Sequence, residues 1–188
     1  MKVKSLNRRI AESSMPRVGS TVQRFNNSTI LICNRQRTKK INSRRLKEIA
    51  EALLAELQIT KAELGINMVG AREMALVNET FLQHEGPTDV ITFDHRNCEG
   101  RRAKGEVEIH GELFICVDVA LAQAKEFKSS WQAEIIRYIV HGVLHLVGHD
   151  DLKPHLRRKM KREENRLVRR LGNRFSLAQL SRAAKLGA

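Results

Sequence analysis

The residues best suited to chemistry in this chain lie close together, in the stretch HGVLHLVGHDD at residues 141–151. His141 and His145 are four residues apart in a segment of helical periodicity, so both imidazoles are expected on one face of a helix. Gly148 offers a place for that helix to end. Two imidazoles from one helix and a further donor beyond its end are typical of a zinc site with three protein ligands, which leaves one coordination position open for water.

The third ligand remains open between three residues on spacing alone. Asp151 lies six residues after the second histidine, the spacing of the third ligand in zinc endopeptidases of the HExxHxxGxxH type. A carboxylate oxygen is an acceptable zinc donor. His149 directly follows the glycine and His155 lies further along, so both are alternatives to Asp151. We expect the metal ligands to be His141, His145 and Asp151.

Two neighbouring positions limit the chemistry further. A zinc peptidase of the HExxH type uses the Glu after its first histidine as the general base. That position is Gly142 in this chain, which has no side chain, so peptidase chemistry lacks its base. Asp150 is expected either to cap the following helix or to orient a ligand imidazole.

A second segment of interest is residues 78–94, which contains Pro-Thr-Asp directly before a β-branched stretch. Such residues are ordinary in a tight turn that enters a strand. The functional interpretation is that they form a polar wall facing the metal. The candidate cleft residues on this interpretation are His84, Thr88 and Asp89, together with His149.

The chain is strongly basic: its 188 residues carry a formal net charge of +13, from 34 Lys and Arg against 21 Asp and Glu. An excess of this size indicates a polyanionic partner such as RNA. It is concentrated in residues 152–171, with nine Lys or Arg against two Glu, and in the polar loop 96–105. Aromatic residues make up only 4%, which argues against a dedicated base-stacking platform. The expected RNA-binding residues are Arg101, Arg102, Arg157, Arg158, Lys161 and Arg162.

Strand-like and helix-like segments follow one another from residue 29 onward. Apolar and β-branched runs predict strands over residues 29–36, 62–70, 88–95 and 106–118. Helical periodicity predicts helices over residues 43–58, 71–83, 119–127, 131–148 and 152–171, with Ser43 as the first N-cap and Ser129 or Ser130 at the start of the fourth. This order predicts one α+β or mixed α/β domain over residues 29–171, between a basic, disordered arm at 1–28 and a basic tail at 172–188.

Cysteine usage and hydropathy predict a cytoplasmic protein that does not enter a membrane. No apolar run approaches the roughly 18–20 residues that span a bilayer. Cys33, Cys98 and Cys116 are odd in number and lack CxxC spacing, as expected of reduced thiols in a cytosol. Residues 1–28 lack the apolar centre of a secretory signal. Besides a basic arm, they could be an organelle transit peptide or the product of a start codon assigned too far upstream.

Three segments together resemble the YbeY family of bacterial endoribonucleases. Residues 141–151 are similar to the family signature HGxLHLxGxDH, and residues 76–94 are similar to LNxxYRxKDxPTDVLSF. Residues 111–116, GELFIC, are similar to the family's GDIxIC strand. The order and spacing of the segments match those of the family, and the similarity covers roughly residues 28–170.

The resemblance implies a fold, an activity and partners. The fold would be a compact α+β domain, with a mixed β-sheet of about four strands flanked by about five helices and a cleft that holds one zinc ion per chain. The activity would be cleavage of single-stranded RNA in ribosomal RNA maturation, notably at the small-subunit 3′ end, with a role in ribosome quality control. The partners would be ribosomal RNA and the small ribosomal subunit or its assembly factors, with no membrane involved.

The chain departs from the family pattern at two positions. Asp151 stands where the signature has a third histidine, and its negative charge should make a bound water less acidic than an all-imidazole site would. Leu82 stands where the family has an Arg that lines the cleft, which removes a cation from transition-state stabilisation. The substitutes that the sequence offers are His84, or Arg101 and Arg102 in the basic loop.

Three functions compete at this point. The first is a metal-dependent endoribonuclease, in which the ion lowers the pKa of a bound water and polarises a phosphate oxygen, with no obvious general base in the signature. The second is a non-catalytic ribosome-assembly factor with a structural metal. The third, a zinc peptidase, is opposed by Gly142 and by the basic charge.

Overall fold

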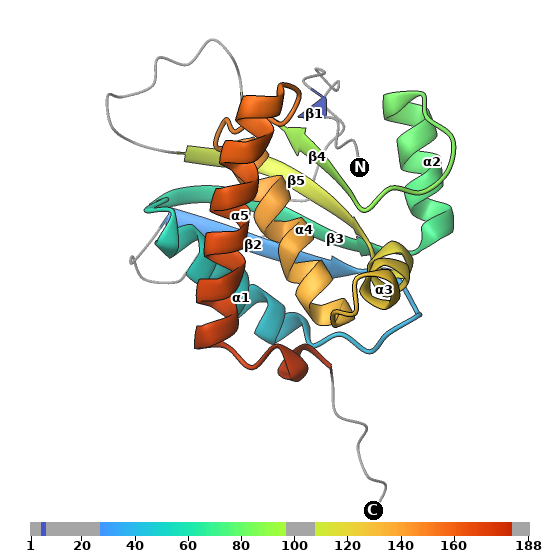
Figure 1. The fold of residues 1–188 in the computed structure, drawn as a ribbon, viewed down its shortest axis with the longest axis horizontal. Coiled ribbons are helices and arrows are strands. Elements are labelled where there is room, and N and C mark those ends of the chain that lie inside the picture. The colour runs from blue at the N-terminus through green and yellow to red at the C-terminus, as the bar shows by residue number, and fades with distance from the viewer. Residues whose placement is uncertain (1–4, 7–26, 97–107, 182–188) are drawn as a thin grey trace, which may run out of the picture.

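The computed structural model describes residues 5–6, 27–96 and 108–181 and contains one mixed sheet (Figure 1). Its main strands are β2 (Asn27–Asn34), β3 (Lys61–Val69), β4 (Val90–Asp94) and β5 (Glu108–Cys116). The two-residue strand β1 (Ser5–Leu6) lies at the edge, and the order is β1-β4-β5-β3-β2. β2, β3 and β5 run parallel, whereas β4 runs antiparallel to β5, so the predicted mixed sheet is confirmed.

Five α-helices and one 3₁₀ helix accompany the sheet in the described part of the chain. They are α1 (Ser43–Glu56), α2 (Ala71–Leu82), α3 (Val117–Glu126), α4 (Trp131–Leu146), α5 (Pro154–Arg174) and η1 (Leu177–Leu180). In Figure 1, α1, α4 and α5 lie over one face of the sheet. The predicted α+β domain with about five helices is confirmed, and each predicted element is present with ends shifted by a few residues.

The two faces of the sheet have separate cores because successive strand residues point to opposite sides. On β4, Val90 packs into the larger core with α1, α4 and α5, whereas Ile91 packs into a smaller core with α2. On β5, Ile115 and Cys116 divide between the two cores in the same way. Both faces are therefore apolar, and α4 lies within the larger core.

Side-chain capping sets the starts of two helices. The N-cap of α1 is Asn42, whose Oδ1 accepts a hydrogen bond from the backbone N–H of Arg45 at 3.1 Å. The prediction of Ser43 as N-cap was wrong by one residue, because Ser43 is already helical. At the start of α4 the N-cap is Ser130, whose Oγ accepts a hydrogen bond from the backbone N–H of Ala133 at 3.2 Å. Ser130 is one of the two residues predicted for this position.

The described part of the predicted C-terminal tail belongs to the folded domain. α5 continues to Arg174, and η1 follows it with Leu180 buried in the larger core. The carbonyl of Leu180 accepts a hydrogen bond from the backbone N–H of Asn42 at 2.8 Å, and Ser181 pairs with Ile41. Residue 171 is therefore not the end of the domain, because apolar residues beyond it complete the core beside α1.

Much of the predicted N-terminal arm at 1–28 lies outside the described residues, as do Cys98, Arg101 and Arg102. Of the remaining cysteines, Cys116 is buried and Cys33 is half-buried. In the described ranges, no helix has the length and apolar character needed to cross a membrane.

Gly142 lets α4 lie close against the sheet. A Cβ atom at this position would lie 2.6 Å from Cδ2 of Leu113 and 3.1 Å from Oγ1 of Thr92. Leu113 and Thr92 are both buried in the sheet and have little room to move. The glycine therefore fixes the height of α4 above β4 and β5, and with it the position of the two histidines on that helix.

We expect Gly142→Ala to destabilise the fold by about 1–3 kcal/mol, because the added methyl overpacks the contact with Leu113. Gly172→Ala is the matched control, since a Cβ there meets nothing within 4 Å on exposed α5. That change should stabilise the protein by up to about 1 kcal/mol through helix propensity. Urea unfolding measures both free energies, and a Gly142→Ala variant as stable as the parent would contradict the close approach.

Candidate metal centre and cleft

α4 presents His141 and His145 on one face, as their spacing predicts. The Nε2 atoms of the two rings are 3.1 Å apart. His145 is buried, whereas His141 is partly exposed toward the cleft. Burial lowers the pKa of His145, and the neighbouring His141 lowers it further, although Asp151 acts in the opposite direction. The neutral imidazole, which is the form that binds metal, is therefore favoured.

The end of α4 returns the chain to the histidines. Gly148 has a φ of +94°, and its N–H bonds to the carbonyl of His145 at 2.9 Å. The N–H of His149 bonds to the carbonyl of Leu144 at 2.9 Å. This pair of bonds is a Schellman motif, which favours glycine at the left-handed position. The turn that follows brings Asp151 back beside the helix.

His141, His145 and Asp151 are brought together and form what we call the metal group. One ligand atom from each lies within 4.8 Å of the others, and Oδ1 of Asp151 is 4.0 Å from Nε2 of His145. The group can hold a metal ion. Among the described residues it is the one cluster of three such side chains.

The two alternative third ligands lie elsewhere. His149 contacts the metal group through its backbone oxygen, which lies 3.1 Å from Nδ1 of His145. His155 is an exposed residue in the first turn of α5. Asp150 neither caps α5 nor contacts an imidazole, because its Oδ1 accepts from the backbone N–H of Leu152 at 2.9 Å. The N-cap of α5 is Lys153, which makes no side-chain capping bond.

The hydrogen bonds of the two rings fit a metal ion between them. Nδ1 of His141 lies 3.0 Å from Oε2 of Glu164, and Nδ1 of His145 faces a carbonyl. A carboxylate and a carbonyl only accept hydrogen bonds, so both Nδ1 atoms carry the hydrogen. When both rings are neutral, their Nε2 lone pairs point toward each other, which is unfavourable unless a cation lies between them. Two nitrogens on a tetrahedral zinc ion lie about 3.3 Å apart, close to the separation here.

Glu164 on α5 is the buried acceptor that holds His141. Its carboxylate also accepts from Nη1 of Arg137 at 2.5 Å and from Nζ of Lys161 at 2.7 Å. Burial by itself would raise the pKa of Glu164, but the bonds from His141, Lys161 and Arg137 outweigh it and lower the pKa to about 2. An ionised carboxylate therefore orients the imidazole, in the manner of the carboxylate–histidine–zinc arrangement.

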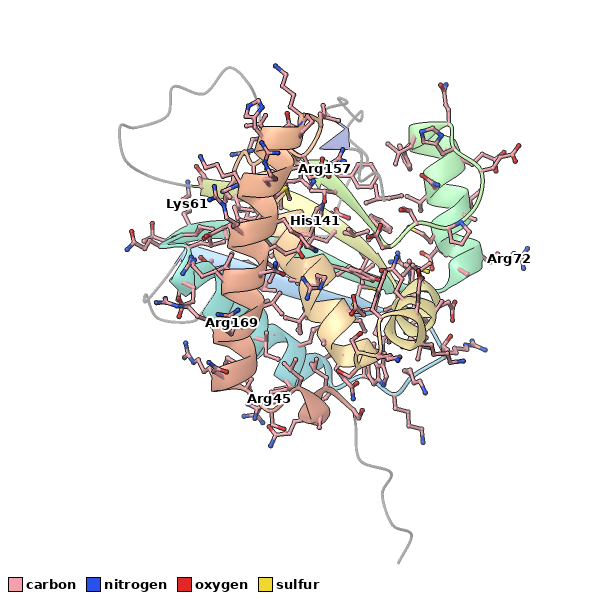
Figure 2. The ribbon with its side chains drawn as sticks, viewed as in Figure 1. Arg45, Lys61, Arg72, His141, Arg157 and Arg169 are labelled. Atoms are coloured by element: carbon pink, nitrogen blue, oxygen red, sulfur yellow. The ribbon has the colours of Figure 1, made fainter. Side chains whose placement is uncertain are left out.

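A cleft of about 660 Å³ opens beside the metal group, between α3, α4 and α5. His141 and Asp151 line it, together with side chains from earlier turns of α4, among them Glu134 and Arg137. From α5, Arg157 and Lys161 also reach its wall. Figure 2 shows Arg157 and His141 extending from their two neighbouring helices. The cleft therefore combines a possible metal site with several cations.

The predicted cleft residues divide between two hollows. Asp89 lines the main cleft, and Thr88 donates its hydroxyl hydrogen bond to Oδ1 of Asp89 at 2.9 Å. Thr88 itself lines a smaller hollow of about 320 Å³, together with His84 and Leu82. His149 lines neither hollow. Asp89 reaches the main cleft because β4, the strand that directly follows it, packs against α4.

The basic residues predicted to bind RNA also divide. Arg157 and Lys161 line the cleft, whereas Arg158 and Arg162 are exposed elsewhere on α5. Arg157 donates from Nε to the backbone oxygen of Asp151 at 3.0 Å, which ties it to the metal group's loop. The loop arginines, at positions 101 and 102, lie outside the described residues.

Two functional candidates were missed by the sequence reasoning, and each carries a signal in its spacing. Glu164 is an acid within the buried stripe of α5, between Met160 and Leu167 at helical intervals. An acid at such a position needs a buried partner. Arg137 lies one helical turn before His141 and therefore shares its face of α4.

Glu164→Gln should weaken metal binding about 10- to 100-fold, because the amide holds the His141 ring less firmly and removes a negative charge. Competition with a chromophoric chelator measures the metal affinity. The matched control is Glu163→Gln, which removes the adjacent carboxylate that pairs with Arg166 away from the cleft. Equal metal affinities of the two variants would contradict the role given to Glu164.

Comparisons with known proteins agree with this geometry. A family model described as Endoribonuclease YbeY matches residues 31–172. A protein named Endoribonuclease YbeY from Chlorobium phaeovibrioides is 33% identical over 128 residues, which cover 68% of this chain and 81% of the relative. Its namesake from Bacteroides fragilis is 32% identical over 128 residues, which cover 68% of this chain and 86% of the relative.

A solved structure shows the same fold. The solution structure of a Thermotoga maritima protein aligns with a TM-score of 0.57 at 21% identity, covering 85% of this chain and 99% of the other. The span matched by the family model contains all of the metal group and Glu164. On the extent of that match and the identity of its relatives, this chain belongs to the YbeY family.

Proposed function

We propose that this protein is a metal-dependent endoribonuclease that cleaves single-stranded RNA. Its relatives carry the name endoribonuclease, which supports this class of reaction. The observation that carries the proposal is the metal group at a cleft that is also lined by Arg137, Arg157 and Lys161. Cations beside a metal site suit a phosphodiester, because negative charge builds up on its oxygens during cleavage.

Zinc is the proposed ion, with one bound per chain. Two imidazole nitrogens and one carboxylate oxygen are a donor set that zinc accepts, and three protein ligands leave a position for water or phosphate. When bound by these three residues, zinc would supply polarisation of a phosphate oxygen and a lower pKa for a coordinated water. His141 and His145 would hold the ion through their Nε2 atoms, and Asp151 would add a negative charge that offsets part of the ion's charge.

The exposed side of α5 is proposed to position the RNA strand. Arg158 and Arg162 are one turn apart on this helix and are exposed, so they can neutralise successive phosphates. Arg101 and Arg102, in the basic loop 96–105, are proposed to contribute further phosphate contacts. Such contacts supply affinity without sequence readout, since they reach phosphates rather than base edges.

The proposed biological setting is ribosomal RNA maturation, notably at the small-subunit 3′ end, together with ribosome quality control in the cytoplasm. The family resemblance supports this setting, and the small ribosomal subunit or assembly factors would be the partners. The net charge of +13 is consistent with a ribonucleoprotein substrate.

A second candidate function is a non-catalytic ribosome-assembly factor with a structural metal. The observation in its favour is Leu82, an apolar residue at the smaller hollow where the family pattern has an Arg. Peptidase chemistry has no comparable support. Gly142 is buried against Leu113 and Thr92, so a side chain at that position would meet the sheet.

The two candidates predict opposite results in a cleavage assay. Purified protein should cleave a fluorophore-labelled single-stranded RNA when zinc is present and stop when a chelator removes it. His141→Ala and His145→Ala should each lose nearly all activity, because each removes one of three ligands. Metal-independent RNA binding with no cleavage of either RNA or assembling ribosomal particles would favour the assembly factor instead.

The double variant Arg158→Gln, Arg162→Gln should weaken RNA binding and reduce its salt dependence. Each phosphate contact to a single strand contributes about 0.7 to the magnitude of the slope of log affinity against log salt concentration. Removing two contacts should therefore reduce the magnitude of this slope by about 1.4. The matched control is Arg44→Gln, Arg72→Gln, which removes the same charge from α1 and α2. Fluorescence anisotropy at several salt concentrations measures the slopes, and identical slopes for the two double variants would contradict this RNA path.

A further inference from the structure

Arg137 occupies a particular position in the cleft. It precedes His141 by one turn of α4, a rise of about 6 Å, and both side chains line the same cleft. The Arg137 side chain is 29% exposed, so it is half-buried and remains in reach of a bound molecule.

The guanidinium is fixed by neighbours on α5 and on α4 itself. Nη1 donates to Oε1 of Glu164 at 2.5 Å and to Oδ1 of Asn165 at 3.0 Å, while Nε lies 3.8 Å from Oε2 of Glu134. The other oxygen of Glu164 holds Nδ1 of His141. One buried carboxylate therefore positions both the ligand imidazole and the guanidinium, and it couples their geometry.

One edge of the guanidinium remains available. Within the described residues, Nη2 of Arg137 makes no hydrogen bond, although a guanidinium has five N–H donors. Glu164 also faces Lys161, so this single carboxylate serves two cations. A half-buried Arg with unused donors at a cleft wall suits an anionic ligand, and its fork matches phosphate oxygens.

The other cations of the cleft are less well placed for this role. The Lys161 side chain is 56% exposed, and Arg157 is exposed and donates its Nε to a backbone oxygen. Both would lose more side-chain freedom on fixing a phosphate than Arg137, whose position is already set.

We infer that Arg137 is a phosphate-binding residue of the cleft and that its Nη2 donates to a non-bridging oxygen of the scissile phosphodiester held at the metal group. This inference rests on the proposed function, since it names the group that stabilises charge in the same reaction. Arg137 would contact the substrate directly, whereas Glu164 acts as a positioning residue through Arg137 and His141.

The test compares Arg137→Lys and Arg137→Ala with Arg72→Lys and Arg72→Ala, using a labelled single-stranded RNA with zinc. Arg72 is exposed on α2, away from α4 and α5 (Figure 2). Arg137→Ala should lower kcat about 100-fold, the usual loss for one preorganised donor. Arg137→Lys keeps a charge beside Glu164 but lacks the fork, so its loss should also lie mainly in kcat. Bound zinc and thermal midpoint are measured for every variant.

Chemical rescue separates substrate contact from a structural role. Guanidinium ion added to Arg137→Ala should restore part of the lost kcat, and it should leave the Arg72 variants unchanged. Arg137→Lys with full zinc and a parental thermal midpoint but undiminished kcat would overturn the inference. The inference would also be overturned if Arg137→Lys lost bound zinc in proportion to its activity and guanidinium ion did not rescue Arg137→Ala. No cleavage by the parent protein would instead refute the proposed function.

Discussion

The site depends most on the hydrogen bond between the buried carboxylate of Glu164 and Nδ1 of His141. This bond joins α5 to α4, fixes the imidazole in the form whose Nε2 can bind metal, and positions Arg137 through the other carboxylate oxygen. A buried charge is costly unless it is fully hydrogen-bonded, and here three donors surround it. Because the buried carboxylate must keep all of its hydrogen bonds, it can adopt only one orientation. The packing of α5 on α4 therefore also fixes the geometry of the site.

The fold could be predicted largely from the sequence because its elements obey local rules. Apolar runs and helical periodicity located every main strand and helix. The failures arose where tertiary contacts decide. Asn42 rather than Ser43 caps α1, since the chain entering α1 is also paired with the C-terminal segment at Leu180. The domain extends past residue 171 because Leu180 is buried in the larger core. The basic composition around Leu180 gave no indication of this burial.

The site was predictable in part, for a different reason. Helical spacing and the glycine turn placed Asp151 beside the histidines, since these features act within one short stretch of chain. Glu164 lies 23 residues from His141, and only the packing of α5 on α4 brings them together. His84 was predicted for the metal cleft but lines the smaller hollow, because the loop before β4 divides its side chains between two surfaces. The spacing of Glu164 within the buried stripe of α5 indicates that it needs a buried partner, but only the packing of α5 on α4 decides that the partner is His141.

The metal group is proposed to hold one ion through two imidazole nitrogens and the Asp151 carboxylate. Zinc K-edge X-ray absorption of the zinc-loaded protein tests it most directly, because the spectrum counts imidazole and oxygen ligands around the ion. Two imidazoles with oxygen completing the shell are expected, and one imidazole fewer in His141→Ala. A shell that contains sulfur, or a spectrum unchanged in His141→Ala, would show that zinc binds elsewhere and would contradict the ligand set His141, His145 and Asp151.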